Sequence, residues 1–301
     1  MAAMSYDDRD GTIWMNGEFI AWRDAQVHVL SHALHYASSV FEGERIYGGE
    51  IFKLTEHTER LHASAEMLDF EIPYSVADVD QACKELIVKQ ELNEGYVRPI
   101  AWRGSEQIGV AAQNSKINVA IAAWNWGSYF DMEQRLKGIR LTEAKYCRPD
   151  PATIPAKAKA AGLYMICTLE KHRAEREGYA DALMCDWRGQ IAECTGANVF
   201  FIKDDVLHTP TPDCFLDGIT RRTVIELAKR RGLEVVERAI MPDELNTFEQ
   251  CFITGTAAEV TPVSEIGSHT FHVGETIKTL IHDYINEVTP SAPNMAKTAS
   301  A

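Results

Sequence analysis

Positive charge, paired cysteines and long apolar runs are all scarce in this sequence. Its 301 residues include 44 Asp and Glu against 30 Lys and Arg, which gives a formal net charge of −14. This charge would repel a polyanion and no broad basic stretch offsets it, so neither nucleic acid nor an anionic membrane is an expected partner. No stretch approaches the roughly 18 apolar residues of a membrane-spanning helix.

The seven cysteines are scattered along the chain, and none of them forms a C-x-x-C pair. Their odd number and spacing argue against a disulfide framework or a zinc knuckle, and favour a reducing cytoplasm. The N-terminal MAAMSYDDRDG lacks the basic start and apolar run of a signal peptide. His32 and His35 share a predicted helical face, but no carboxylate or cysteine lies at ligand spacing. We therefore expect them to be packed or hydrogen-bonded, and we expect no metal site.

Glycine-rich nucleotide loops are missing too, since the chain has neither a G-x-G-x-x-G nor a Walker motif. The composition is otherwise that of a globular protein, 46% hydrophobic and 25% charged, and the length allows two cores. Asn16-Gly17 and Gly48-Gly49 each lie between apolar segments and predict hairpins. Apolar positions at helical spacing predict two helices, one with Leu54, Leu61, Ala65 and Leu68 and the other with Val76, Val79, Cys83, Leu86 and Ile87. With buried strands near 97–102 and 117–124, residues 1–126 are expected to form a smaller α+β domain.

Apolar periodicity lapses after Trp126, so residues 127–138 are the expected interdomain loop. Residues 139–288 are expected to form a larger domain with further strands, hairpins and three helices, one of which ends at the basic cluster Lys229-Arg230-Arg231. The small, polar tail 289–301 is expected to be disordered. Hairpins mixed with helices in both halves predict an α+β fold, not a doubly wound parallel sheet.

Four polar motifs in the second half have an order that suits a phosphate-bearing aldehyde cofactor: KAKAAGLY, GQIAECTG, LDGIT and TGTAAE. LDGIT places Gly218 and Thr220 at a predicted helix start, where unpaired N–H groups and the helix dipole favour a phosphate. TGTAAE leaves backbone amides after a strand open to an anion. Each motif alone also fits a helix cap or a tight turn. Lys157 and Lys159 would face the same side of an extended segment, so spacing leaves both lysines open.

Six segments together resemble the branched-chain aminotransferases of fold type IV: SHALHYASSVFEGERIY, YVRP, KAKAAGLY, AECTGANVFF, LDGIT and TGTAAEVTPV. The resemblance covers about Ile13 to Val288. It implies a two-domain α+β fold, pyridoxal 5'-phosphate (PLP) as the cofactor, and transamination between L-leucine, L-isoleucine or L-valine and 2-oxoglutarate. A shared active site in this family would make a homodimer the minimum unit.

The resemblance selects Lys159 over Lys157 as the catalytic lysine, which carries the cofactor as a Schiff base and then moves the substrate proton. Glu193 would keep a proton on the cofactor's ring nitrogen, and Tyr164 would lie near its phenolic oxygen. We expect the ring cation and a desolvated pocket to lower the pKa of Lys159. The residues implied to bind the cofactor are Arg60, Lys159, Tyr164, Glu193, Leu216, Ile219, Thr220 and Thr256.

For the substrate, the resemblance implies apolar walls that fit a branched side chain, some of them contributed by a partner subunit. Tyr96 and the amides of Thr256 and Ala257 would hold the α-carboxylate, and Arg98 would pair with the second carboxylate of glutamate or 2-oxoglutarate. The implied substrate-binding residues are Tyr36, Phe41, Tyr96, Arg98, Val110, Trp126, Thr256 and Ala257.

Relatives of the same fold include D-amino acid aminotransferases, (R)-selective amine transaminases and aminodeoxychorismate lyase. The Tyr96-x-Arg98 pair and the Phe41-x-Gly43-x-Arg45 run favour the branched-chain group. Glu44 and Ala161 depart from the family pattern, which bears on side-chain specificity more than on catalysis. A lyase would need no amino acceptor, so dependence on an acceptor separates the two reaction classes.

Overall fold

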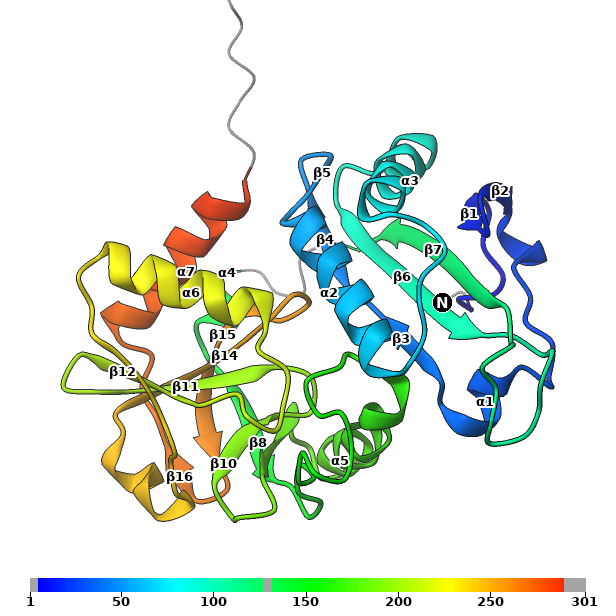
Figure 1. Ribbon diagram of the computed structural model, residues 1–301. Helices are drawn as coiled ribbons and strands as arrows, with labels where there is room; N and C mark the ends of the chain where they lie inside the picture. Colours follow the sequence, from blue (N-terminus) through cyan, green and yellow to red (C-terminus); the bar gives the residue numbers. More distant parts are fainter. Residues whose placement is uncertain (1–4, 127–131, 290–301) are drawn as a thin grey trace, which may run out of the picture.

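The computed structural model describes residues 5–126 and 132–289, and their strands form two sheets (Figure 1). The first sheet has seven strands in the order β2-β1-β7-β6-β4-β5, with β3 also paired to β6, and its pairings are antiparallel. Its strands are β1 (Thr12–Met15), β2 (Glu18–Ala21), β3 (Ser39–Phe41), β4 (Glu44–Tyr47), β5 (Glu50–Ile51), β6 (Gly95–Arg103) and β7 (Ile117–Asn125).

Two helices of fourteen residues each, α2 (Leu54–Met67) and α3 (Val76–Lys89), cover one face of this sheet. Ser75 is the N-cap of α3, and its side chain forms a capping box with Asp78. Most residues of the predicted apolar faces form the core between helices and sheet: Leu54, Leu61, Ala65, Val79, Cys83, Leu86 and Ile87 are buried. Leu68 and Val76 are only half-buried. A short helix, α1 (His32–Tyr36), precedes β3.

The second sheet has nine strands in the order β10-β9-β8-β15-β14-β11-β12-β13, with β16 paired to β15. It is mixed, because β8 pairs in parallel with β9 and β15, and β12 pairs in parallel with β13. Its strands are β8 (Ile139–Glu143), β9 (Asp181–Cys185), β10 (Ile191–Cys194), β11 (Asn198–Lys203), β12 (Val206–Pro210), β13 (Val235–Arg238), β14 (Gln250–Gly255), β15 (Glu259–Ile266) and β16 (His269–Thr270).

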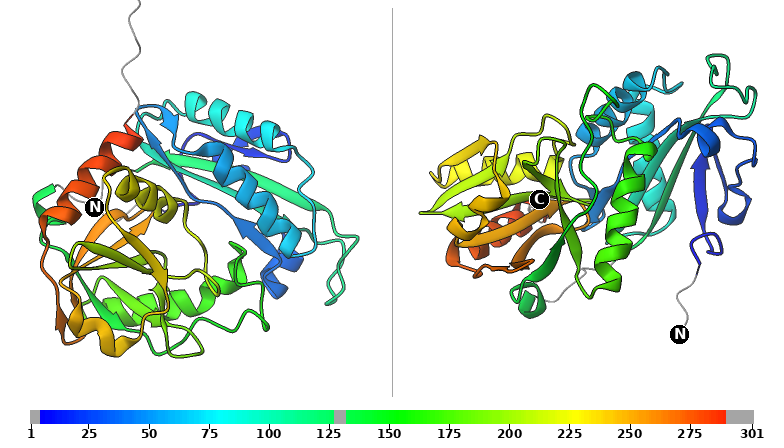
Figure 2. Two further views of the ribbon diagram at one scale, coloured as in Figure 1. Left: turned by 60° about the vertical axis from the view of Figure 1, so that its left-hand side comes forward. Right: turned by 90° about the horizontal axis from the view of Figure 1, so that it is seen from below.

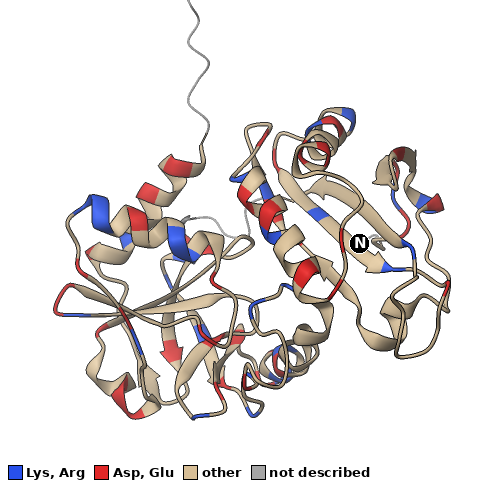
Figure 3. Cartoon of the chain, viewed as in Figure 1, with Lys and Arg blue, Asp and Glu red and all other residues tan. Residues whose placement is uncertain are grey.

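Helices α6 (Ile219–Arg230) and α7 (Glu275–Val288) pack side by side against the second sheet, where Phe200 and Phe252 stack in the core (Figure 2). The predicted basic cluster does end a helix, and Arg230 pairs with Glu287 of α7 at 2.9 Å. Lys, Arg, Asp and Glu are interspersed over both parts of the molecule (Figure 3). No helix in the described ranges is long and apolar enough to span a membrane.

The expected α+β fold is confirmed by two sheets that each carry helices. Both predicted turns also form, since Asn16 and Gly17, and then Gly48 and Gly49, have positive φ. The first sheet ends at Asn125 and the second begins at Ile139, so the expected boundary falls between the sheets. We retain the division into two domains as a proposal. Residues 127–131 of the expected interdomain loop and 290–301 of the expected disordered tail lie outside the described residues.

Candidate active site

Lys159 lies on the segment that leads from β8 to helix α5 (Met165–Arg176), where it contacts β3 of the first sheet and shares a cavity with β10 of the second. Its backbone is fixed from the first sheet's side: the carbonyl of Lys159 accepts from the N–H of Phe41 at 3.1 Å, and its N–H donates to Ser64 Oγ at 3.0 Å. The Lys159 ammonium donates to the hydroxyl of Tyr164 at 3.0 Å. Lys157 is exposed instead, so the structure separates two lysines that spacing alone left equivalent.

One cavity between the sheets collects every residue that the resemblance implied for the cofactor. Besides Lys159, the residues that line this cavity include Arg60, Tyr164, Glu193, Leu216, Ile219, Thr220 and Thr256. They come from α2, the turn before α5, β10, the start of α6 and the connection from β14 to β15. A set drawn from distant parts of the chain therefore meets in one place.

Glu193 lies on β10 and is buried, with each carboxylate oxygen facing a different partner. Arg148 Nε lies 3.3 Å from one oxygen, and Asn198 Nδ2 donates to the other at 3.3 Å. Burial raises the pKa of Glu193 to about 7, while Arg148 and Lys159 act against that rise. A carboxylate with such a pKa is poised to exchange a proton with a nitrogen base placed in the cavity.

Gly218 is the N-cap of α6, and the N–H groups of Ile219 and Thr220 begin the helix without intrahelical acceptors. Asn198 holds this helix start, because its amide donates to the carbonyl of Leu216 at 3.0 Å and accepts from the N–H of Gly218 at 3.2 Å. A Cβ on Gly218 would lie 2.3 Å from the Asn198 amide oxygen, so the close approach requires glycine. The result is a rigid anion cradle at the helix N-terminus.

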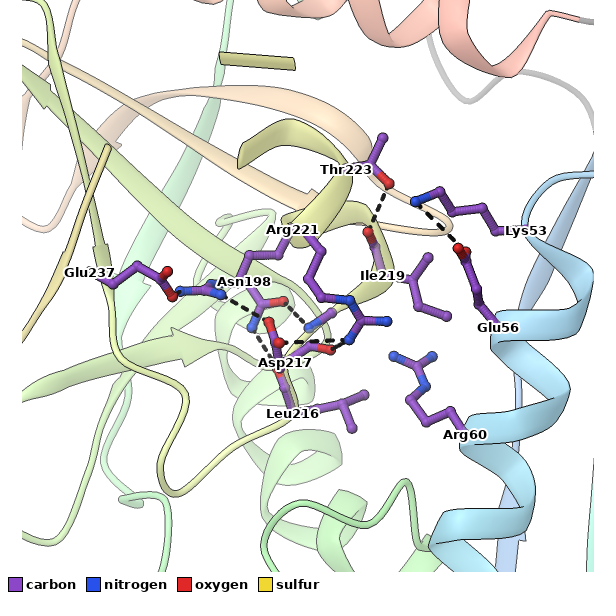
Figure 4. Close-up of polar contacts among 12 residues, drawn as sticks. Lys53, Glu56, Arg60, Asn198, Leu216, Asp217, Ile219, Arg221, Thr223 and Glu237 are labelled. Atoms are coloured by element: carbon purple, nitrogen blue, oxygen red, sulfur yellow. Dashed lines mark hydrogen bonds and ion pairs between the residues drawn. The ribbon is translucent and has the colours of Figure 1, made fainter. Parts of the chain in front are cut away.

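Arg60 approaches this cradle from α2, on the opposite side of the cavity (Figure 4). Its Nε and one terminal nitrogen donate to the two oxygens of Glu42 at 2.7 and 2.8 Å. Glu42 is fully buried and also lies 2.7 Å from His57 Nδ1. One edge of the guanidinium is thereby fixed, which leaves the remaining N–H groups for an anion in the cavity.

The protein's own groups raise the pKa of Lys159 rather than lower it. Burial lowers this pKa, but the neighbouring Tyr164 and Glu42 outweigh burial and stabilise the ammonium. The predicted lowering combines this burial with the cation of the cofactor ring, and the side chains around Lys159 do not produce it by themselves. A basic Lys159 amine therefore depends on a cation other than these side chains.

Three of the implied substrate residues lie beside Lys159. The Phe41 ring is 5.1 Å from the Lys159 ammonium and 4.9 Å from the Tyr164 ring. The Arg98 guanidinium lies over both the Phe41 and Tyr96 rings, at 5.0 and 5.4 Å. Arg98 Nε is buried without a hydrogen-bond partner among the described residues, which suits an acidic ligand.

The other substrate residues divide between positions around this cavity. Thr256 lines the cavity itself, whereas Ala257 and Trp126 line a neighbouring hollow, beside Arg45 and Glu259. Tyr36 and Val110 line a third, open hollow with 46% and 83% of their surface exposed. A single chain therefore does not bring these last two residues to the cavity of Lys159.

Sequence reasoning missed three residues that organise the site: Glu42, Arg148 and Asn198. Glu42 and Asn198 lie inside the segments FEGERIY and TGANVFF. The sequence pattern does not indicate that Glu42 contacts Arg60 or that Asn198 contacts Glu193. Arg148 follows no recognisable pattern. The expectation for His32 fits, because its ring nitrogens face Ser38 Oγ at 2.6 Å and the carbonyl of Gly109 at 3.0 Å.

The fold and this cavity define a class of protein that comparison with known families identifies. The sequence model described as amino-transferase class IV matches residues 39–266, so the chain belongs to this family. A probable branched-chain-amino-acid aminotransferase of Rickettsia bellii is 44% identical over 255 residues, covering 84% of this chain and 86% of that protein. The branched-chain-amino-acid aminotransferase of Pseudomonas aeruginosa is 41% identical, and the alignment covers 90% of each chain.

Solved structures agree with this assignment. The branched-chain amino acid aminotransferase of Escherichia coli superimposes with a TM-score of 0.90 at 36% identity, covering 96% of this chain and 98% of that one. The branched-chain aminotransferase of the archaeon Thermoproteus uzoniensis, solved with norvaline, gives a TM-score of 0.88 at 32% identity, covering 92% and 94%. The similarity thus spans both sheets and the cavity between them.

Proposed function

We propose that this protein is a PLP-dependent branched-chain amino acid aminotransferase, which transfers the amino group of L-leucine, L-isoleucine or L-valine to 2-oxoglutarate. The observation that carries this proposal is the single cavity that joins Lys159, Glu193, Arg60 and the start of α6. Related solved structures are described with pyridoxamine 5'-phosphate, N-(5'-phosphopyridoxyl)-L-glutamate and 4-methylvaleric acid. These ligands match a phosphate-bearing cofactor, an acidic substrate and a branched apolar one.

The residues of the cavity fit PLP, which when bound supplies an electron sink for the bond broken at the substrate Cα. Lys159 would anchor the cofactor and, once displaced by the substrate amine, move the proton at Cα. Glu193 would hold a proton at the ring nitrogen, and Tyr164 would donate toward the phenolic oxygen. Arg60, Ile219, Thr220 and Thr256 would bind the phosphate, with Leu216 packed beside the ring.

The substrate would lie against Phe41, with its side chain on apolar surface and its acidic groups toward polar ones. Tyr96 and the amides of Thr256 and Ala257 would hold the α-carboxylate. The buried, unpaired Nε of Arg98 supports a role in binding the second carboxylate of glutamate or 2-oxoglutarate. Trp126 would extend the aromatic wall, since its ring centroid is 5.4 Å from that of Tyr96. One pocket would then serve both half-reactions.

We further propose that two copies of the chain assemble as a homodimer that completes the substrate pocket. Val29, Leu34, Tyr36 and Val110 are large apolar residues with 71%, 64%, 46% and 83% of their surface exposed. Such exposure is costly in water unless another molecule covers the residues. The face that carries Tyr36 and Val110 would place these residues at the pocket of a second copy. The seven free cysteines support a reducing, cytoplasmic location.

Replacing Val110 with Asp tests the shared pocket. Because Val110 is exposed in one chain, the substitution should leave the fold of the protomer intact, but a buried charge would weaken a dimer interface. Light scattering should show dissociation at concentrations where the wild type is dimeric, and the KM for leucine should rise at least about fivefold. A fully active wild-type monomer would contradict the proposal.

The reaction itself is tested by absorption spectra and a donor screen. The purified protein should carry a cofactor band that bleaches when L-leucine is added and returns with 2-oxoglutarate. L-Leucine, L-isoleucine and L-valine should be far better donors than D-alanine, because the apolar surface near Phe41 suits branched side chains. The reverse order of donors would reject the substrate assignment. Product formation without any amino acceptor would indicate a lyase.

A further inference from the structure

The connection between β14 and β15 ends on an unusual residue. Gly255 pairs with Glu259 in the register of the two strands, so Thr256, Ala257 and Ala258 form a three-residue turn between them. Glu259 closes the turn with φ +53°, in the left-handed region that glycine occupies most easily. A glutamate in this conformation is strained, and such strain persists where surrounding contacts enforce it.

The contacts that enforce it come from outside the second sheet. The Glu259 carboxylate is buried and accepts a hydrogen bond from the hydroxyl of Tyr47 at 2.9 Å. Arg45 lies 3.9 Å from the same oxygen, and Arg135 donates to the other oxygen. Arg45 and Tyr47 belong to β4 of the first sheet, and Arg135 to α4 (Met132–Arg135). One carboxylate thus ties the turn to two separate elements.

The negative charge of Glu259 would not by itself favour the binding of an acidic substrate nearby. A buried carboxylate next to the turn repels a substrate carboxylate, whereas the arginines that neutralise it would attract one. Tyr47 remains a neutral donor, because burial strongly raises its pKa. Removal of the Glu259 charge would therefore strengthen the attraction for an anion, if charge were the whole role of this residue. Loss of its contacts would instead release the turn.

We propose that Glu259 is a positioning residue: held by Tyr47, Arg45 and Arg135, it fixes the Thr256–Ala258 turn so that the backbone N–H groups of this turn face the substrate α-carboxylate. The inference rests on the proposed function, which assigns the amides of Thr256 and Ala257 to that carboxylate. Both carboxylate oxygens of Glu259 are engaged by Tyr47, Arg45 and Arg135, so it acts through the backbone and not by touching substrate. It also makes the position of the turn depend on the first sheet.

The test measures binding of 4-methylvalerate, a branched carboxylate that cannot react, to the holoenzyme by titration of the cofactor absorbance. Glu259→Gln should weaken binding about tenfold, which corresponds to about 1.4 kcal/mol. Glu259→Gly should weaken binding to a similar extent, although it relieves the backbone strain, because it removes the same contacts. The neutral amide of the same acid should bind wild type and variants alike. Glu265→Gln, on the same strand and paired with Arg140 near the surface, is the matched control and should bind like wild type.

The outcomes separate the inference from the function on which it rests. Tighter or unchanged binding of 4-methylvalerate by Glu259→Gln would overturn the positioning role. Tight binding by Glu259→Gly would also overturn it, because backbone conformation alone would then suffice. If neither variant folds, the same titration is made with Tyr47→Phe. This variant should bind 4-methylvalerate about threefold more weakly, because it lacks one hydrogen bond to Glu259. A wild-type protein that neither binds 4-methylvalerate nor transaminates leucine would reject the proposed function instead.

Discussion

Replacement of Lys159 by alanine is expected to remove covalent cofactor binding and to lower turnover by at least about a thousandfold. Lys159 is the lysine whose ammonium lies in the cavity, 3.0 Å from the Tyr164 hydroxyl, and its backbone is held by Phe41 and Ser64. Among the described residues that line this cavity, no other side chain is an amine. The same variant should keep its fold, since the shortened side chain leaves these backbone contacts in place.

Lys157→Ala is the matched control, because Lys157 lies two residues away but is exposed. It should retain wild-type turnover within about twofold, as is usual for a surface substitution away from a site. Borohydride reduction of the wild-type holoenzyme followed by peptide mass mapping should place the cofactor on Lys159. A label on Lys157, or normal turnover by Lys159→Ala, would show that the assignment is wrong.

Local signals allowed much of the fold to be predicted from the sequence. The turns at Asn16-Gly17 and Gly48-Gly49 depend on the backbone preferences of the residues themselves. The two amphipathic helices were predictable because a helix that packs on an apolar core needs apolar residues at helical spacing. The parallel pairs that β8 makes with β9 and β15 were not predictable in this way. They join segments about 40 and 120 residues apart, and strand order across such distances leaves no local pattern.

The same distinction between local and tertiary signals applies to the candidate site. Family motifs pointed to Lys159, Glu193 and the start of α6, because the motifs carry the groups that contact the cofactor. The partners that set the state of those groups come from elsewhere in the chain: Glu42 fixes Arg60, and Arg148 faces Glu193. Such pairs are formed by tertiary packing, so the effect of Tyr164 and Glu42 on the pKa of Lys159 could be assessed only once both side chains had been placed.

Glu193→Gln is expected to lower turnover about a hundredfold, a loss typical of one preorganised electrostatic group, and yet to stabilise the cofactor-free protein at alkaline pH. Glutamine has the shape of the protonated acid but cannot bear the negative charge that keeps a proton on a ring nitrogen. The pKa of Glu193 is raised by burial from 4.5 to about 7, even with Arg148 opposite. The folded protein therefore favours the neutral form of this side chain.

The sign of the stability change follows from that raised pKa. A carboxyl whose pKa is higher in the folded state contributes stability below pH 4.5, and the contribution is lost as pH rises through about 7. The full loss corresponds to about 3 kcal/mol, and Glu193→Gln should not suffer it. Urea unfolding of the cofactor-free proteins should thus give similar stabilities at pH 4.5 and a more stable variant at pH 8. If the wild type and the variant lost the same stability between pH 4.5 and pH 8, Glu193 would not be the group whose ionisation destabilises the folded protein. A gain at pH 8 would show that the site keeps an ionised Glu193 at the expense of stability, as expected of a group retained for its charge on the cofactor.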